Sequence, residues 1–165
     1  MEILALDVGT TESGFCVVDE NYNILKFGKW QNESILELIN ESCFSHLIYE
    51  KFECYGMPIG QSTINAIEWN GRFKQLAISQ YIEVDSISRK EEKLNLCNSL
   101  KAKDSNIRLA LIDRFAKHDL KNGKGTKKNP DTFYGFAKDM WSAFAIAATY
   151  LDKKKKEQKK VNIWS

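Results

Sequence analysis

The sequence predicts an α/β domain built on a five-stranded mixed sheet, in which three antiparallel strands are followed by two parallel strands and helices flank the sheet. Three strand-like segments come first, and a polar turn joins the second to the third. Helical and strand-like segments alternate after that, which is typical of parallel strands joined by helices. With 165 residues, 43% of them hydrophobic, the chain is long enough to bury one core without disulfides or metals.

The first strand is an uninterrupted apolar run over residues 3–8 that ends at Gly9 and two threonines. Such a short run is typical of a strand buried on both faces. Residues 13–18 alternate as a second strand, the polar cluster 19–23 forms a hairpin turn, and residues 24–30 return as a third strand. These three strands are therefore expected to be antiparallel neighbours.

Two further strands, each preceded by a helix, complete the predicted sheet. A helix over residues 34–42 leads into the apolar strand 46–50. After a loop, a long helix over 62–80 carries apolar residues on more than one side, and a fifth strand follows at 81–84. The long helix needs two partners, of which one is the sheet and the other is either the core or a second subunit.

The second half of the chain is predicted to be helical apart from one long loop. Ser86 or Ser88 caps a helix that runs to about Leu100, and a further helix covers 106–116. The remaining segments are a loop too long for a passive connector, an apolar helix and a frayed basic tail, over residues 118–135, 136–152 and 153–165. Residues 1–152 are thus expected to form the domain.

Asp7 is the anomalous residue of the first strand, because an unpaired buried carboxylate is unfavourable by several kcal/mol unless a partner compensates it. Glu50 ends the fourth strand in the same way, and Asp139 lies in the first turn of the last apolar helix. Adjacent parallel strands end side by side, and a helix laid over the sheet edge can bring the third acid close. Carboxylates this close repel one another, and the shortage of His and paired Cys favours Mg²⁺ or Mn²⁺ as the compensating ion.

Charge is distributed unevenly along the chain, although the formal net charge is only +2. Residues 1–85 contain five Lys or Arg and thirteen Asp or Glu, whereas residues 86–165 contain nineteen and nine. Six of the lysines lie in residues 153–160, but the second half stays basic without them. Such asymmetry favours nucleic acid, or another anionic surface, as the partner.

Neither a membrane partner nor a disulfide is expected. No window contains the ~18 apolar residues of a membrane helix, and the chain leads into its first strand without a signal-peptide pattern. The four cysteines form no C-x-x-C pair, so free thiols in a reducing compartment are expected and a zinc site is not. The chain is therefore predicted to act in the cytoplasm.

Three motifs in chain order resemble those of RuvC-type Holliday-junction resolvases of the kind that phages carry, which have the RNase H-like fold. They are residues 6–10, 48–51 and 138–147, with the sequences LDVGT, IYEK and KDMWSAFAIA. The order of elements also matches that fold, and the resemblance covers about residues 1–152. It implies a structure-selective endonuclease that nicks paired strands of four-way and other branched DNA as a homodimer, in the host cytoplasm if a phage encodes it.

The resemblance also implies two-metal phosphodiester hydrolysis, with two Mg²⁺ or Mn²⁺ ions per site. Asp7 would bridge the ions, Glu50 would hold the ion at the leaving oxygen, and Asp139 would hold the ion that activates water. The long helix around Trp69 is the candidate dimer surface. DNA phosphates would be contacted by three lysines that fall where the family keeps basic residues and by four in the long loop: Lys93, Lys101, Lys103, Lys121, Lys124, Lys127 and Lys128.

Ser142 departs from the family pattern, which has a second Asp one helical turn after the position of Asp139. A hydroxyl binds Mg²⁺ weakly and brings no charge, so one ion would be held less tightly. Several explanations stay open: a water-mediated metal contact through Ser142, replacement by another acid such as Asp131 or Glu53, or cleavage that is reduced or inactivated.

Other functions compete with this one. Sugar kinases of the actin superfamily also have an Asp-x-Gly-Thr-Thr turn, but they need two such domains around ATP and this chain supplies one. A branched-DNA-binding protein with weak or lost cleavage, and a general RNase H-like nuclease that acts on RNA–DNA hybrids or flaps, remain alternatives. No organic cofactor is expected.

Overall fold

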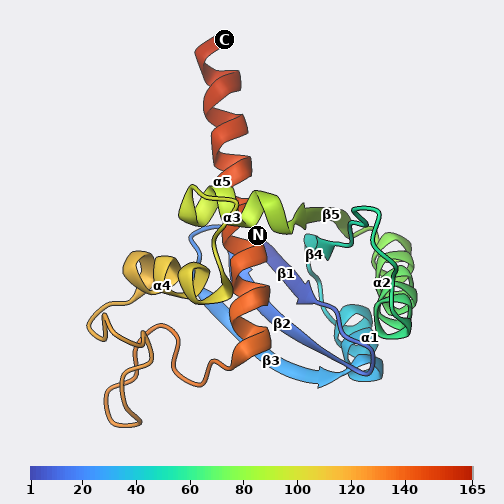
Figure 1. Cartoon of the computed structure of the whole chain (residues 1–165), viewed down its shortest axis with the longest axis horizontal. Helices are drawn as coiled ribbons and strands as arrows, with labels where there is room; N and C mark the ends of the chain where they lie inside the picture. Colours follow the sequence, from blue (N-terminus) through green and yellow to red (C-terminus); the bar gives the residue numbers. More distant parts are fainter. Residues whose placement is uncertain (165) are drawn as a thin grey trace.

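A five-stranded mixed sheet forms the centre of the computed structural model, which describes residues 1–164 (Figure 1). Its strands are β1 (Glu2–Asp7), β2 (Glu12–Asp19), β3 (Ile24–Gln31), β4 (His46–Lys51) and β5 (Glu83–Ser88). They lie in the order β3-β2-β1-β4-β5, with antiparallel pairing from β3 to β1 and parallel pairing from β1 to β5. The predicted fold class is therefore confirmed.

Within residues 1–164, five helices surround the sheet: α1 (Asn32–Glu41), α2 (Gln61–Ser79), α3 (Arg89–Cys97), α4 (Asp104–Phe115) and α5 (Lys138–Trp164). Helix α5 lies across one face, and α1 and α2 lie on the other side (Figure 1). Alternation along β1 explains the division: Ile3 and Ala5 pack in the cluster that contains Phe144 of α5, whereas Leu4 and Leu6 pack in the cluster of α1 and α2. The apolar run of β1 is thus buried on both faces, as predicted.

Strand β5 ends four residues later than predicted, at Ser88 rather than Val84. Asp85 and Ser86 make this segment resemble a loop, but β5 is the edge strand and its only buried residues are Ile87 and Ser88. A half-buried edge strand tolerates polar residues, so hydrophobicity alone places its end too early. Ser88 caps α3, as predicted, and that helix therefore begins directly at the edge of the sheet.

Helix α5 continues past Asp152, where the sequence predicts its end, and runs to Trp164. Its C-terminal part projects beyond the sheet (Figure 1). The prediction of a frayed tail is therefore wrong for residues 153–164, because the lysine-rich segment continues the same helix. Ser165 lies outside the described residues.

Disulfides and membrane-spanning helices are both absent from the part of the chain that the structure describes. The four cysteines are free thiols, as predicted, with Cys16 buried and both Cys43 and Cys54 exposed. None of the helices within residues 1–164 combines the length and the apolar character that crossing a bilayer requires.

A chain that ends at Asp152 is expected to keep its fold. Among the contacts that it loses, Lys153 Nζ lies 3.1 Å from Glu91 Oε1 and Lys156 Nζ lies 2.9 Å from Asn95 Oδ1, both on α3, and Lys155 Nζ lies 4.0 Å from the centroid of the Tyr22 ring. Exposed polar pairs contribute roughly 0–1 kcal/mol each, so Tm should fall by only a few degrees. Thermal unfolding followed by circular dichroism measures this, and loss of the cooperative transition would show that the fold needs the last residues.

Candidate active site

Asp7 and Glu50, the first two predicted acids, lie side by side at one edge of the sheet. Leu6 of β1 pairs with Tyr49 of β4, so the next residue of each strand, Asp7 or Glu50, continues the same row. Asp7 lies two residues after Ala5, and Glu50 lies two residues after Ile48; Ala5 and Ile48 both belong to the core cluster that packs against α5. Because alternate residues of a strand share a face, the side chains of both acids point to the α5 face of the sheet.

Gly14 leaves the space in which Asp139 joins them. Strand pairing sets Asp7 of β1 opposite Gly14 of β2, and Gly14 opposite Lys29 of β3. A Cβ built on Gly14 would lie 2.6 Å from both the Cβ and the carbonyl oxygen of Asp139, so a side chain there would push away the start of α5. Asp139 is therefore placed between Asp7 and Lys29, and Lys29 Nζ is 2.8 Å from Asp139 Oδ2.

Asp7 lines two neighbouring hollows. Hollow A has a volume of about 230 Å³ and contains Asp7 and Asp139, whereas hollow B has a volume of about 220 Å³ and contains Asp7 and Glu50. Cationic side chains line both hollows, Lys29 in hollow A and both Lys51 and Arg89 in hollow B. The three predicted acids are thus brought together as two pairs that share Asp7.

Burial opposes ionisation of Asp7 and Glu50, and repulsion from neighbouring acids adds to the effect on Asp7. The pKa of Asp7 is raised to about 6, first by burial and then by the charges of Glu50 and Asp139, while Ser142 and Arg89 act to lower it. Burial also raises the pKa of Glu50, against the opposing charge of Arg89. A divalent cation near these oxygens would relieve the repulsion and favour the ionised acids.

The donor set in the two hollows fits a hard divalent ion. Three carboxylates line each hollow, Asp7, Glu12 and Asp139 in hollow A and Asp7, Glu50 and Glu53 in hollow B. Mg²⁺ is usually bound by one or two carboxylates while it keeps several water ligands. No group of three His, Cys, Asp or Glu side chains within residues 1–164 is arranged so that it could hold a metal ion by itself. The residues therefore suit ions that complete their coordination with water or substrate oxygens.

A buried polar network fixes the turn that follows β1. Ser13 Oγ donates to Asn32 Oδ1 at 2.6 Å and accepts from the backbone N–H of Gly9 at 3.2 Å. Asn32 Nδ2 in turn donates to the Gly9 carbonyl oxygen at 3.1 Å. These bonds tie the end of β1 to the start of α1, so the backbone that carries Asp7 is held on both sides.

A larger groove adjoins hollow B through Arg89, which lines both. It has a volume of about 570 Å³ and lies among α4, the long loop and the start of α5. Trp141 and Ile112 supply part of its apolar lining, and we name it the basic groove for its charged side chains: Arg89, Arg108, Lys121, Lys124 and Lys138. Five of the seven predicted DNA-binding lysines line neither the basic groove nor the two hollows: Lys93, Lys101, Lys103, Lys127 and Lys128.

The sequence does not single out four of the basic residues at the site: Lys29, Arg89, Arg108 and Lys138. Arg89 follows β5 directly, so the correct end of β5 would have placed it beside the acids at the same sheet edge. Lys29 can be found only from the register of β2 with β3. Lys138 begins the motif of residues 138–147 but is not distinguished within it, and no sequence pattern marks Arg108.

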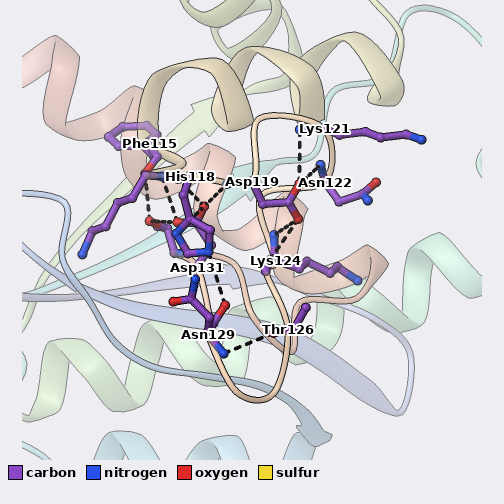
Figure 2. Close-up of polar contacts among 12 residues, drawn as sticks. Phe115, His118, Asp119, Lys121, Asn122, Lys124, Thr126, Asn129 and Asp131 are labelled. Atoms are coloured by element: carbon purple, nitrogen blue, oxygen red, sulfur yellow. Dashed lines mark hydrogen bonds and ion pairs between the residues drawn. The ribbon is translucent and has the colours of Figure 1, made fainter.

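Two carboxylates organise the long loop between α4 and α5 (Figure 2). Asp131 accepts four backbone N–H bonds of 2.6 to 2.8 Å, from Lys117, His118, Asp119 and Thr132. Asp119 accepts four more, from Lys121, Asn122, Lys124 and Gly125. Against the effect of burial, these bonds hold the pKa of Asp131 well below its usual range, and backbone bonds also lower the pKa of Asp119.

The loop is also anchored in the core. Phe133 is fully buried, with its ring centroid 4.5 Å from that of Trp141 and 5.3 Å from that of Phe144. Gly123 has a φ of +71°, and a Cβ built on it would lie 2.8 Å from the Phe133 ring. The loop is therefore a packed element that presents its lysines from a fixed backbone.

Asp131 and Glu53, the two acids proposed to replace the carboxylate missing at Ser142, lie in different places. The carboxylate of Asp131 is used by its own loop, so the interpretation of Asp131 as a metal ligand is wrong. Glu53 does line hollow B with Asp7, and it accepts a hydrogen bond from the Tyr55 hydroxyl. Ser142 is close enough to affect the pKa of Asp7.

Solved structures that are similar to this one agree on a single fold, although no family model and no curated protein matches the sequence. Thermus thermophilus RuvC in complex with a Holliday junction substrate is similar, with a TM-score of 0.67 and 14% identity over 90% of this chain and 92% of that chain. The protein has the RuvC fold.

Two further solved structures agree with that result. Thermus thermophilus RuvC alone has a TM-score of 0.65 and 16% identity, over 90% of this chain and 92% of that chain. The yeast mitochondrial Holliday junction resolvase has a TM-score of 0.56 and 15% identity, over 90% of this chain and 77% of that chain. The RuvC fold predicted from the three sequence motifs is therefore confirmed.

Replacing Asp7 by Asn is expected to stabilise the metal-free protein at pH 8. Because the folded-state pKa of about 6 exceeds the ordinary value of 3.8, ionised Asp7 opposes folding above pH 6, and this effect disappears as the pH falls toward 4. The shift corresponds to at most roughly 3 kcal/mol. Thermal unfolding in EDTA at pH 8 and pH 4 measures the difference.

Asp113→Asn serves as an exposed control for this measurement. An Asp7→Asn protein that is less stable than wild type at pH 8 would contradict the explanation.

Replacing Asp131 by Asn is expected to loosen the long loop selectively. An amide has one acceptor oxygen, so about half of the four backbone N–H groups bound by Asp131 would lose their acceptor. Hydrogen exchange should accelerate by more than tenfold in residues 117–132 and stay unchanged in the sheet. Unchanged exchange in the loop would show that packing of Phe133 alone holds it.

Proposed function

We propose that this protein is a metal-dependent, structure-selective endonuclease that nicks paired strands of four-way DNA junctions and of other branched DNA. The observation that carries the proposal is the position of Asp7, a half-buried carboxylate shared by two hollows, of which one is also lined by Asp139 and the other by Glu50. Two-metal phosphodiester hydrolysis uses acids in such an arrangement. Likeness to a RuvC structure that contains a Holliday junction substrate supports the choice of DNA.

Asp7, Glu50 and Asp139 would hold two Mg²⁺ or Mn²⁺ ions, with Asp7 shared, and Ser142 a further candidate through a water molecule. When bound, such ions supply an activated water and stabilise the charge of the leaving oxygen. Asp139 is free to act as a ligand once Lys29 gives up its ion pair. The Lys29 side chain is 45% exposed and also lies 3.8 Å from Glu12, so it has another carboxylate to approach.

Junction DNA would lie along the basic groove, with its phosphates near Lys121 and Lys124. Charged side chains at that groove supply the salt-dependent part of the affinity. Lysines outside the groove would contact the arms of the junction farther from the reacting phosphate: Lys93, Lys101, Lys103, Lys127 and Lys128.

A homodimer through α2 accords with the requirement to cut two strands. Ile64 and Ile67 on α2 are 40% and 39% exposed, and Met57 and Ile59 in the preceding loop are 72% and 46% exposed. Apolar side chains gathered in one segment are typical of an interaction surface. Trp69 packs against Phe73 of the same helix and would support the dimer surface from within.

A branched-DNA-binding protein with weak cleavage is the second candidate function. It is favoured by Ser142, which replaces a carboxylate, and by the Lys29 ion pair, which neutralises Asp139 in the absence of metal. A general RNase H-like nuclease is the third, and it differs from the first in substrate alone.

With Mg²⁺, the wild-type protein is expected to nick a synthetic four-way junction in opposing strands. Asp7→Asn should lower the rate on the order of 10²- to 10⁴-fold, because the shared carboxylate is lost. At limiting Mg²⁺ the rate should fall as the pH drops toward 6, because protonation of metal-free Asp7 competes with metal binding. Gel assays of end-labelled junctions at several pH values measure both effects.

Parallel assays separate the candidates. A splayed duplex and an RNA–DNA hybrid at equal salt test substrate choice, and preference for the hybrid would favour the general nuclease. Ser142→Asp should increase both the Mn²⁺ affinity and the cleavage rate, since it restores a charged ligand. Junction binding without nicking, even with Mn²⁺, would overturn the endonuclease and leave the binding protein.

A further inference from the structure

Glu92, on α3, is an acidic residue with a fully buried side chain beside the candidate active site, and none of the roles above uses it. Its Oε2 lies 2.5 Å from Nη1 of Arg89, whereas its Oε1 has no hydrogen-bond partner among the described residues. A buried carboxylate with an unpaired oxygen is unfavourable for folding, and buried ion pairs are often no more stable than apolar replacements. Stability of the fold therefore does not explain why an acid is found at this position, and its role is expected to lie in its effect on Arg89.

Arg89 is held from two sides. Its Nη1 contacts Glu92 and its Nη2 contacts Asp104 Oδ1. The start of α3 is fixed independently by a capping box, in which Ser88 Oγ accepts from the Glu91 N–H and the Glu91 carboxylate accepts from the Ser88 N–H. The ion pairs are thus not needed to begin the helix, and their effect is to orient the guanidinium.

The guanidinium lies where the basic groove meets hollow B, because Arg89 lines both. On the hollow side its charge acts on Asp7 and Glu50, and on the other side it lines the basic groove together with Ser142 and Arg108. These two bonds use two of the five N–H donors of the guanidinium, which leaves donors for an anion. A DNA strand in the groove would reach the acids at this point.

We propose that Arg89 binds a DNA phosphate at the entrance to hollow B and that Glu92 is the residue that positions it. The inference rests on the proposed function and assigns a phosphate-binding residue with a fixed orientation to the proposed active site. The exposed loop lysines Lys127 and Lys128 can follow the backbone in many conformations, whereas an oriented guanidinium binds phosphate in one geometry. Arg89 would therefore fix the phosphate relative to Asp7 and Glu50 before hydrolysis.

The first test measures junction binding in EDTA at several salt concentrations. Loss of one phosphate contact lowers the slope of log K against log salt by about 0.9. Arg89→Gln is expected to show this loss, whereas Arg89→Lys should keep the wild-type slope because the charge remains. Lys159→Gln removes an exposed charge outside the groove and both hollows, and it should keep the slope as well.

The second test measures single-turnover cleavage at saturating protein. Glu92→Met removes the acceptor but fills a similar volume, so it should leave the salt slope unchanged and slow cleavage roughly 10- to 100-fold. Glu92→Gln keeps an oxygen that accepts from Arg89, and it should recover part of the rate. If the ion pair only stabilises the fold, Glu92→Met should lower Tm but should not slow cleavage while leaving binding unchanged.

Each outcome decides a part of the proposal. A wild-type slope for Arg89→Gln overturns the phosphate contact, and a wild-type rate for Glu92→Met overturns the positioning role. If Glu92→Met does not fold, Arg89→Lys decides instead, because it keeps the charge but not the two-sided attachment: slower cleavage supports positioning and an unchanged rate overturns it. A wild-type protein that binds junctions without nicking them overturns the proposed endonuclease, while the salt slope still decides the phosphate contact.

Discussion

The candidate active site depends on one row of residues that crosses four strands, Lys29, Gly14, Asp7 and Glu50, with Asp139 of α5 packed over its glycine. Backbone pairing sets the order of this row, so the acids are placed by the sheet and not by flexible side chains. Gly14 is the tightest point, because its missing side chain sets how closely α5 can approach β1. The spacing of the acids is therefore a property of the whole core.

Charge is concentrated at this row in a way that opposes folding and favours the binding of a cation. Burial weakens the ionisation of Asp7, and the same low dielectric strengthens its attraction to any cation that enters. Lys29 and Arg89 moderate the repulsion from opposite ends, one in each hollow. The protein thus contains a partial substitute for the positive charge that a metal ion or a bound partner would bring.

The sequence is sufficient to predict the sheet and the acids, because Asp7 interrupts an apolar strand and Asp139 begins an apolar helix. It is insufficient for Arg89, because the polar residues of β5 conceal where the edge strand ends. Lys29 joins the site only through strand register, which a local pattern does not contain. Asp131 looks like a free ligand in the sequence, since nothing there indicates that its oxygens are occupied by backbone N–H groups of its own loop.

The two carboxylates that organise the long loop have a further consequence for how the protein would meet DNA. Because Asp119 and Asp131 hold the backbone in place, most of the conformational entropy of the loop is lost during folding and not during association. A preformed basic surface can be steered by long-range attraction and needs no folding step on contact, so encounters should be fast and strongly dependent on ionic strength. If the proposed function is correct, bending and opening of the junction would then be the rate-limiting step of recognition.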